Sequence, residues 1–490
     1  MRTIRRTIWA AICMVGMIAP ITMAQQQSQQ PPADQSAPPI PAYRSPLASA
    51  ADNGDDEGLI ADPHKMIPDD RSLTGAERFS LGELATGHSY WQPHVDFTST
   101  ISSNGLSSTT NTGWTSWSTF YGGIDLHRVA GNSDLSMLYS GGASVSNSGS
   151  SNTGIIQNLQ FADRLAYRHA TLSLIDQLNY LPENAFGSQF GNTGTPLGTG
   201  SNGLQPGLVP GQSILTTSGQ RLSNSFVPEV DVKLTSRTSL TFVGNYSLLH
   251  FFDNDLLNYY SAGGRMGYDR QLTRKDTIGV SYSFNAYRYS NFNQSIDDHV
   301  VYVSYGRRVT GKLAFQIAAG PEYTIFETPI TSTGNTGTGT ASSSSSHLYW
   351  SLNTSLTYQL RRTGLGLTYA HGVSGGSGVQ AGSVADTVTG SATRQLSRTF
   401  SGIWSLSYGR NNGLTVNAPG STTANQTFDY WSSNVGLSHT MGRTMNLGLN
   451  YLLQYQNSNS AFCVGPTCGS SFVVNQIMVS LGWHEHPIPF

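Results

Sequence analysis

Residues 350–371 read WSLNTSLTYQLRRTGLGLTYAH, and apolar and polar side chains alternate along them. One face carries Trp350, Leu352, Leu356, Tyr358 and Leu360, and the other carries Ser351, Asn353, Ser355, Thr357, Gln359 and Arg361. The alternation resumes after Arg361–Gly364. A period of two indicates strands, because successive side chains of a strand point to opposite faces. The stretch therefore predicts a β-hairpin whose two faces meet different solvents.

The composition suits a wall between lipid and water. The chain has 490 residues, of which 11% are charged and 38% hydrophobic, and it contains 53 glycines. An average soluble domain has about 25% charged residues. A chain short of both classes and rich in Gly, Ser, Thr, Asn and Tyr is atypical of a soluble enzyme. The formal net charge of −2 gives no indication of nucleic-acid binding.

The N-terminal residues predict secretion. Arg2, Arg5 and Arg6 precede an apolar run over 7–21, and Thr22-Met23-Ala24 follows. This pattern predicts a signal peptide over 1–24, with cleavage after Ala24. A retained anchor is the alternative, but the run is short for a membrane span. Residues 25–90 are rich in Pro, Gln and acids, which predicts a disordered periplasmic tail.

Two cysteines remain after the signal peptide, Cys463 and Cys468 in the run CVGPTC. In an oxidising compartment, this spacing favours a local disulfide that pins a loop. A metal site is disfavoured because no histidine or acid lies nearby.

From residue 91 to the end, the chain predicts a single all-β domain. The expected strands are 91–101, 117–128, 134–146, 154–168, 170–181, 225–235, 238–250, 259–272, 276–289, 297–309, 312–326, 347–361, 364–374, 384–396, 399–410, 426–440, 443–457 and 471–483. Their length matches that of tilted membrane strands rather than sandwich strands. We therefore expect a transmembrane, antiparallel, up-and-down β-barrel of about 18 strands, because only a closed sheet satisfies its backbone in lipid.

The connections between these strands alternate strictly between short and long. Short ones include AGNS, LTRK, VTGK and MGRT, whereas long ones include 182–224 and TPITSTGNTGTGTASSSSS. Outer-membrane barrels have tight periplasmic turns and long extracellular loops. An even number of strands returns both ends of the barrel to the same side of the membrane.

Over about residues 90–483, the sequence resembles the bacterial outer-membrane β-barrel class and is porin-like in size. The resemblance lies in the pattern of strands and loops, so no functional residue is carried over from a family. It implies placement in the outer membrane of a Gram-negative cell, periplasmic termini and extracellular long loops. Such barrels commonly end on an aromatic residue, and Phe490 is terminal here. Pro487 and Pro489 predict that no ladder forms there and that the last strand ends near Trp483.

The inward faces of the expected strands supply candidate pore-lining residues. Those with charged or amide side chains are Arg164, Glu229, Asp231, Lys233, Arg265, Asp269, Glu322, Asn353, Gln359, Asn450 and Gln454. The charges belong to the earlier strands, and the strands from 347 onward contribute Ser, Thr, Asn, Gln and Gly. The charges either form a transverse field that selects solutes or pair across strands, at about 0.2–1 kcal/mol each. The neutral wall favours an uncharged, hydrogen-bonding solute such as a saccharide.

Two acids break the pattern, because the alternation of side chains along their strands places Asp163 and Asp176 on the lipid face. One explanation is a β-bulge that turns them inward. The other is that their hairpin faces a neighbouring subunit or holds a shared proton or divalent ion.

Two further features have alternative interpretations. The short turns are basic, as in Arg274-Lys275 and Arg307-Arg308, and they either attract anions or snorkel to lipid headgroups. The long loop 182–224 either folds into the barrel as a constriction or covers its mouth.

The function that the sequence favours is a channel for passive or substrate-preferring diffusion of small hydrophilic solutes, because barrels of this size enclose water. The alternatives are an exopolysaccharide-export barrel and a plugged surface barrel that acts through its loops. No nucleophile, base and orienting group fall together, so we expect no enzyme activity, cofactor or metal. The expected partners are outer-membrane lipids and small solutes, and a homo-oligomer is compatible with the outward acids.

Overall fold

The computed structural model describes residues 89–103, 114–147, 154–181, 220–252, 258–290, 294–331, 340–376, 381–414, 427–458 and 471–490. Within them, the chain forms one antiparallel sheet of 19 strands. Eighteen strands make a closed barrel, and a two-residue strand follows the last of them. The predicted fold class is confirmed.

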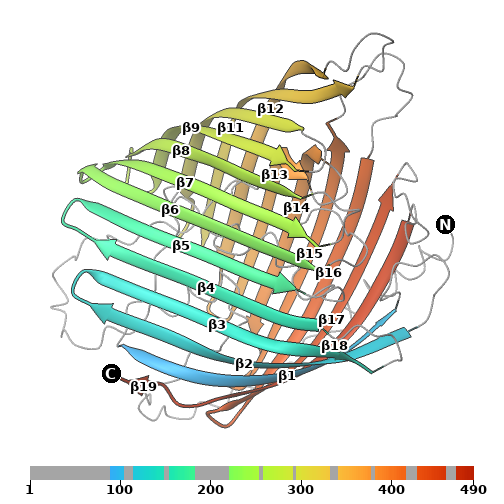
Figure 1. Cartoon of the computed structure of the whole chain (residues 1–490). Helices are drawn as coiled ribbons and strands as arrows, with labels where there is room; N and C mark the ends of the chain where they lie inside the picture. Colours follow the sequence, from blue (N-terminus) through green and yellow to red (C-terminus); the bar gives the residue numbers. More distant parts are fainter. Residues whose placement is uncertain are drawn as a thin grey trace, which may run out of the picture. The chain divides into compact units, whose positions relative to one another are not determined.

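The strands follow one another around the barrel in chain order, and they run obliquely along its wall (Figure 1). They are β1 (Tyr90–Ser103), β2 (Trp114–Ala130), β3 (Ser133–Ser146), β4 (Gly154–Ala166), β5 (Ala170–Leu181), β6 (Arg221–Thr235), β7 (Thr238–Phe251), β8 (Tyr259–Gln271), β9 (Asp276–Tyr289), β10 (Ser295–Arg308), β11 (Leu313–Thr331), β12 (Thr340–Gln359), β13 (Thr363–Gly376), β14 (Ala381–Gln395), β15 (Phe400–Gly413), β16 (Thr427–Met441), β17 (Met445–Ser458), β18 (Ser471–His484) and β19 (Ile488–Pro489).

Backbone pairing between the first and last long strands closes the cylinder. β1 pairs with β2 on one edge and with β18 on the other, from His94↔His484 to Ser102↔Gln476. Closure matters in lipid because an unpaired N–H or C=O group there has no water to bind.

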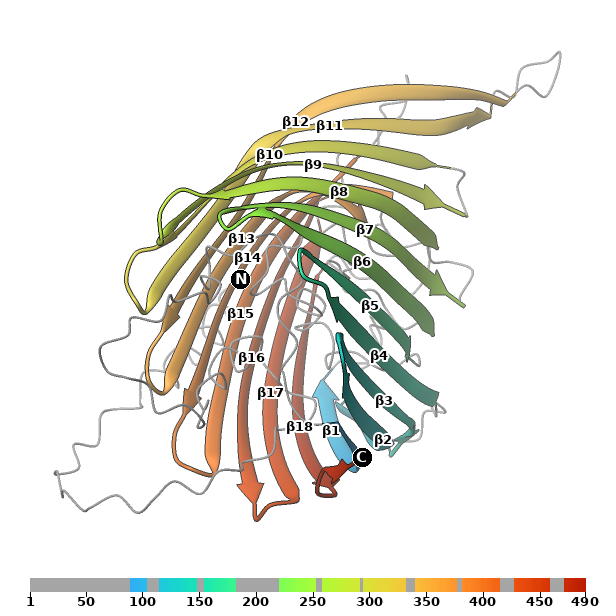
Figure 2. The same cartoon turned by 90° about the vertical axis from the view of Figure 1, so that its left-hand side faces the viewer.

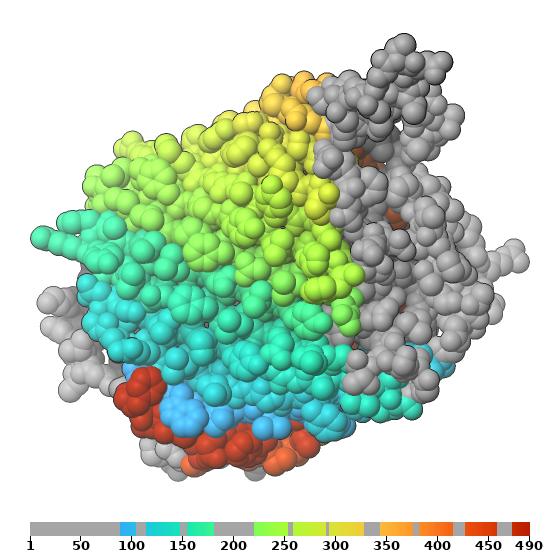
Figure 3. Space-filling view, viewed as in Figure 1, coloured from blue at the N-terminus to red at the C-terminus, as the bar shows by residue number. Residues whose placement is uncertain are grey.

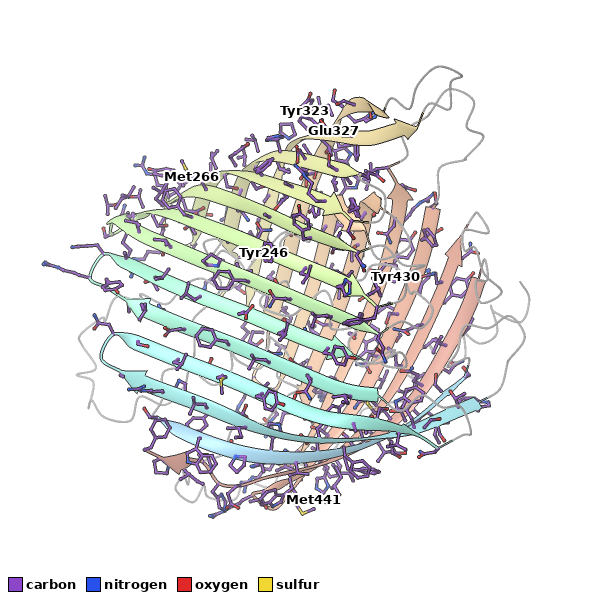
Figure 4. The ribbon with its side chains drawn as sticks, in the orientation of Figure 1. Tyr246, Met266, Tyr323, Glu327, Tyr430 and Met441 are labelled. Carbon is purple, nitrogen blue, oxygen red and sulfur yellow. The ribbon has the colours of Figure 1, made fainter. Side chains whose placement is uncertain are left out.

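Polar side chains face inward and apolar side chains face outward, as the alternation predicts. On β7, Ser239, Thr241 and Ser247 are buried inside, whereas Phe242 and Tyr246 are 41% and 44% exposed on the outside. Tyr246 projects from the outer face (Figure 4). A soluble protein shows the reverse distribution, so the outer face of this barrel is suited to hydrocarbon.

Side chains cover the outer face of the early strands continuously (Figure 3). Exposed apolar residues recur there on successive strands, for example Met266 at 53%, Val280 at 52% and Val303 at 56%. Exposed aromatic residues lie on both halves of the barrel, for example Trp91, Tyr268, Trp350 and Trp431.

The eighteen expected strands are all present, and the largest difference in their bounds lies at β12. We expected this strand to begin at residue 347, but it begins at Thr340. The serine run 342–346 has no alternation to signal a strand. It is held in one because the extended end of β11 pairs with it, from Glu327↔Ser344 to Thr331↔Thr340.

The expectation that no ladder forms near the C-terminus is wrong. β19 pairs with β1 through Tyr90↔Pro489 and Trp91↔Ile488, and the Phe490 N–H donates to the Ser89 carbonyl at 3.4 Å. A proline is tolerated because its missing N–H faces away from the single neighbouring strand. The C-terminus therefore lies beside β1 (Figure 1).

Several predictions concern residues outside those described. They are the signal peptide, the tail up to residue 88, the loop 182–219 and the disulfide between Cys463 and Cys468. Within the described part of the chain, no helix is long and apolar enough to cross a membrane.

Candidate solute path through the barrel

One seam of the wall is paired along only part of its length. β12 pairs with β11 over residues 340–358, but with β13 only from Leu352↔His371 to Gln359↔Gly364. In Figure 2, the ends of β11 and β12 continue past the point where β13 leaves them. Beyond His371, β13 keeps its pairing with β14 alone among the described residues.

Side chains replace the missing backbone partners where β13 separates from β12. The Ser351 hydroxyl donates to the His371 carbonyl at 2.9 Å, and the Val373 N–H donates to Glu322 Oε1 at 2.9 Å. Glu322 belongs to β11, so its carboxylate spans the inner face of β12. Satisfying these backbone groups matters because an unpaired buried N–H or C=O group is costly.

Beyond the seam, the ends of β13 and β14 lean into the barrel. Val373 belongs to a buried cluster with Leu249, Phe251, Tyr259, Tyr287, Tyr289, Ile296 and Phe326, which come from the inner faces of β7–β11. The Tyr289 hydroxyl donates to the Gly375 carbonyl.

Two glycines permit this close approach. A Cβ at Gly375 would lie 2.6 Å from the Tyr287 ring. Gly382 has a φ of +73°, which favours glycine, and its added Cβ would meet Ile296 at 2.3 Å. These contacts narrow the interior at the long-loop end of the barrel.

The charged residues predicted for the lumen face the interior. Glu229, Arg265, Asp269 and Glu322 are 2–5% exposed. The alternation of side chains along β4 and β6 also places Arg164, Asp231 and Lys233 inward. These three residues lie closer to the short-turn end of the barrel. All of them belong to β4–β11.

Arg265 lies at the centre of one group of these charges. Its guanidinium donates to the Ser281 hydroxyl at 3.0 Å and lies 5.9 Å from the centre of the Tyr302 ring. Glu229 and Asp269 interact electrostatically with it from the neighbouring positions. This group brings two acids and a base together within one wall, which is one of the two arrangements that the sequence left open.

The sequence analysis missed further inward charges. They are Asp96, Asp125, Asp134, Arg221 and Asp298, together with His94 and His127. Asp298 was missed because it adjoins Asp297 in the run IDDH, and alternation turns one acid inward and the other outward. Following the alternation of side chains along the strand is sufficient to place Asp298 inward.

The remaining strands supply a neutral wall. Asn353, Gln359, Asn450 and Gln454 face inward as predicted. The acids and arginines within the described strands β12–β18 lie at outward positions, namely Asp386, Arg394, Arg410 and Asp429. Tyr430 points inward and is buried against Gly409 (Figure 4).

Asp163 and Asp176 lie on the outer face. The register between β4 and β5 runs without interruption from Gln157↔Tyr180 to Ala166↔Thr171, so no bulge turns the acids inward. Each acid accepts a hydrogen bond from an outward neutral side chain, as the two pairs Ser133–Asp163 at 2.9 Å and Asn224–Asp176 at 2.8 Å show.

No protein-family model and no curated protein matches this sequence. Among solved structures, the chain is similar to OpdQ of Pseudomonas aeruginosa, with a TM-score of 0.40 and 11% identity over 81% of this chain and 98% of that chain. It is similar to OccK2 (OpdF) of the same organism in complex with glucuronate, with a TM-score of 0.41 and 10% identity over 81% of this chain and 100% of that chain. A third similar structure is P. aeruginosa OpdK with vanillate, with a TM-score of 0.38 and 10% identity over 81% of this chain and 99% of that chain.

Proposed function

We propose that this protein is an outer-membrane channel through which small hydrophilic solutes diffuse. The observation that supports the proposal is the partition of side chains: a closed sheet with an apolar outer face encloses hydroxyl, amide and charged groups. Such an interior stabilises water and dissolved solutes rather than a dry core.

We further propose that the channel prefers cations to anions. The acids at inward positions of the described strands are Asp96, Asp125, Asp134, Glu229, Asp231, Asp269, Asp298 and Glu322, whereas the bases are Arg164, Arg221, Lys233, Arg265 and Arg308. A surplus of fixed negative charge along a narrow path raises the local concentration of cations. The neutral wall formed by β12–β18 still suits uncharged solutes.

Planar-bilayer recording tests both statements. We expect stable conductance steps and, under a KCl gradient, a reversal potential that indicates cation preference. Glu229→Gln combined with Asp231→Asn should reduce that preference by lowering the negative charge of the path. The matched control is Asp429→Asn, which removes an outward acid and should leave the reversal potential unchanged.

A plugged surface barrel is the second candidate, because the ends of β13 and β14 pack across the interior at the long-loop end. Silence from folded, inserted protein would support this candidate and overturn the channel. Liposome swelling with neutral sugars and with organic anions would then compare solute classes in a conducting barrel.

A further inference from the structure

A recess opens into the inner wall where β13 separates from β12. Its lining includes Asp298, Tyr302, Glu322, Ser351 and Gly372, and its open space is about 420 Å³ with the adjoining solvent included. The centre of a water-sized group can occupy about 20 Å³ of it, which is enough to hold one such group. The recess therefore accepts a compact group on a solute rather than a whole sugar ring.

One oxygen in this recess has no hydrogen-bond donor. Glu322 is 2% exposed, and while Oε1 accepts from the Val373 N–H, Oε2 has no partner among the described residues. A Cβ added at Gly372 would lie 3.3 Å from Oε2, which places this oxygen beside the space that the glycine leaves open. A buried carboxylate oxygen without a donor is a position at which a ligand with N–H groups gains a hydrogen bond.

A second carboxylate adjoins the first. Asp298 is 2% exposed, accepts from the Thr324 hydroxyl at 2.9 Å, and interacts with Glu322 both electrostatically and through a side-chain hydrogen bond. No ion pair among the described residues joins either acid to a lysine or arginine. Arg265, the buried cation on the same inner wall, interacts with Glu229 and Asp269. The recess thus holds two acidic side chains that form no ion pair with a lysine or arginine among the described residues.

We propose that this recess, which we call the Glu322 niche, binds the primary ammonium group of a small solute. An –NH₃⁺ group carries three donors and no acceptor. The niche offers two carboxylates and the hydroxyls of Tyr302 and Ser351, which share a hydrogen bond of 2.6 Å. Because the niche opens on the lumen, the solute's remaining atoms stay in the water-filled path.

The size and the donor set separate this ligand from other cations. A planar guanidinium needs more room than one water-sized group. A quaternary ammonium has the charge but no N–H donor for Glu322 Oε2. No group of three or more potential metal ligands of the His, Cys, Asp or Glu type occurs among the described residues. The niche therefore favours a primary amine over a divalent metal ion.

The inference rests on the proposed channel for its role in transport, but binding to the niche is measured without a membrane current. We would titrate the purified full-length protein in detergent with propylammonium, guanidinium, tetramethylammonium and K⁺ by calorimetry at constant ionic strength. We expect propylammonium to bind with one site, and the other organic cations to bind at least tenfold more weakly. Equal binding of tetramethylammonium, or displacement of propylammonium by K⁺ at equal concentration, would overturn the assignment to an amine.

Two variants test the site by different means. Glu322→Gln removes the charge but keeps an oxygen for the Val373 N–H, and it should weaken propylammonium binding at least tenfold. Gly372→Ala keeps both carboxylates and fills the space beside Oε2, and it should weaken binding similarly. The matched control Asp429→Asn removes an outward acid that does not line the niche, and binding should stay within twofold of the wild type. Binding unchanged in both niche variants would contradict the proposal.

Recording and titration together separate the two proposals. Amine binding by a protein that conducts no ions would leave the niche in place and overturn the channel. A conducting protein that binds no propylammonium would retain the channel and overturn the niche.

Discussion

The inner wall has two halves that share one backbone geometry and differ in side-chain chemistry. β1–β11 place acids and bases toward the interior, whereas the described inward positions of β12–β18 are largely hydroxyls, amides and glycines. The outer faces of the two halves are alike, as Val303 at 56% and Leu437 at 45% exposed show. The comparison teaches that the outer faces of both halves keep one apolar character, while the chemistry of the inner face varies between them.

The largest expected effect tests whether the outer faces are equivalent. Val303→Arg and Leu437→Arg should each lower the free energy of unfolding by about 2–4 kcal/mol, because both place a charge in hydrocarbon near mid-strand. Chemical denaturation of the protein in lipid vesicles measures the loss. Inward Asn434→Arg is the control and should cost much less, since its side chain meets water. A small loss at only one of the two outward positions would show that its half does not face lipid.

A smaller effect should separate the inner faces. Arg265→Met removes the cation that adjoins Glu229 and Asp269, and should lower the free energy of unfolding by about 1–3 kcal/mol. In the neutral half, Gln454 is 0% exposed and neither amide atom has a partner among the described residues. Gln454→Leu should therefore change the same quantity by less than about 1 kcal/mol. Equal losses in these two denaturation experiments would remove the energetic distinction between the halves.

The smallest effect concerns acids on the outer face. In the neutral half, outward Asp386 lies 2.7 Å from His371 and outward Asp429 lies 3.8 Å from Arg410. In the charged half, the hydrogen bonds to Asp163 and Asp176 from described residues come from neutral donors.

If lipid surrounds Asp163 and Asp176, replacing both acids by Asn should raise the free energy of unfolding by about 1 kcal/mol. If the hairpin instead faces a second copy of the chain, the double variant should lower stability and reduce the oligomer size, measured by light scattering. No change in melting or in size would exclude both explanations. Asp429→Asn, with an arginine partner, serves as the comparison.

The architecture could be predicted from the sequence because lipid imposes one simple rule on every strand. Alternation at 350–371 placed Trp350 outside and Ser351 inside, as the structure has them. The beginning of β12, from Thr340 to the serine run, was missed because this run carries no alternation and depends on pairing with the extended end of β11.

The candidate site was predicted less completely. Parity identified Glu322 as inward, but nothing local indicates that β13 leaves β12 or that Glu322 then accepts from the Val373 N–H. Such contacts join residues far apart in the chain. They depend on how far neighbouring strands stay parallel, which a periodic pattern does not specify.

The pairing of β1 with β18 has a consequence for biogenesis. Each edge strand lacks its second neighbour until the other has been synthesised, so a partly made chain exposes two long rows of unsatisfied backbone groups. Closure joins residues separated by almost the whole barrel sequence, and contacts of such high order form slowly. A chain that lacks its final strand therefore presents two unpaired edges at which pairing with other chains is favoured.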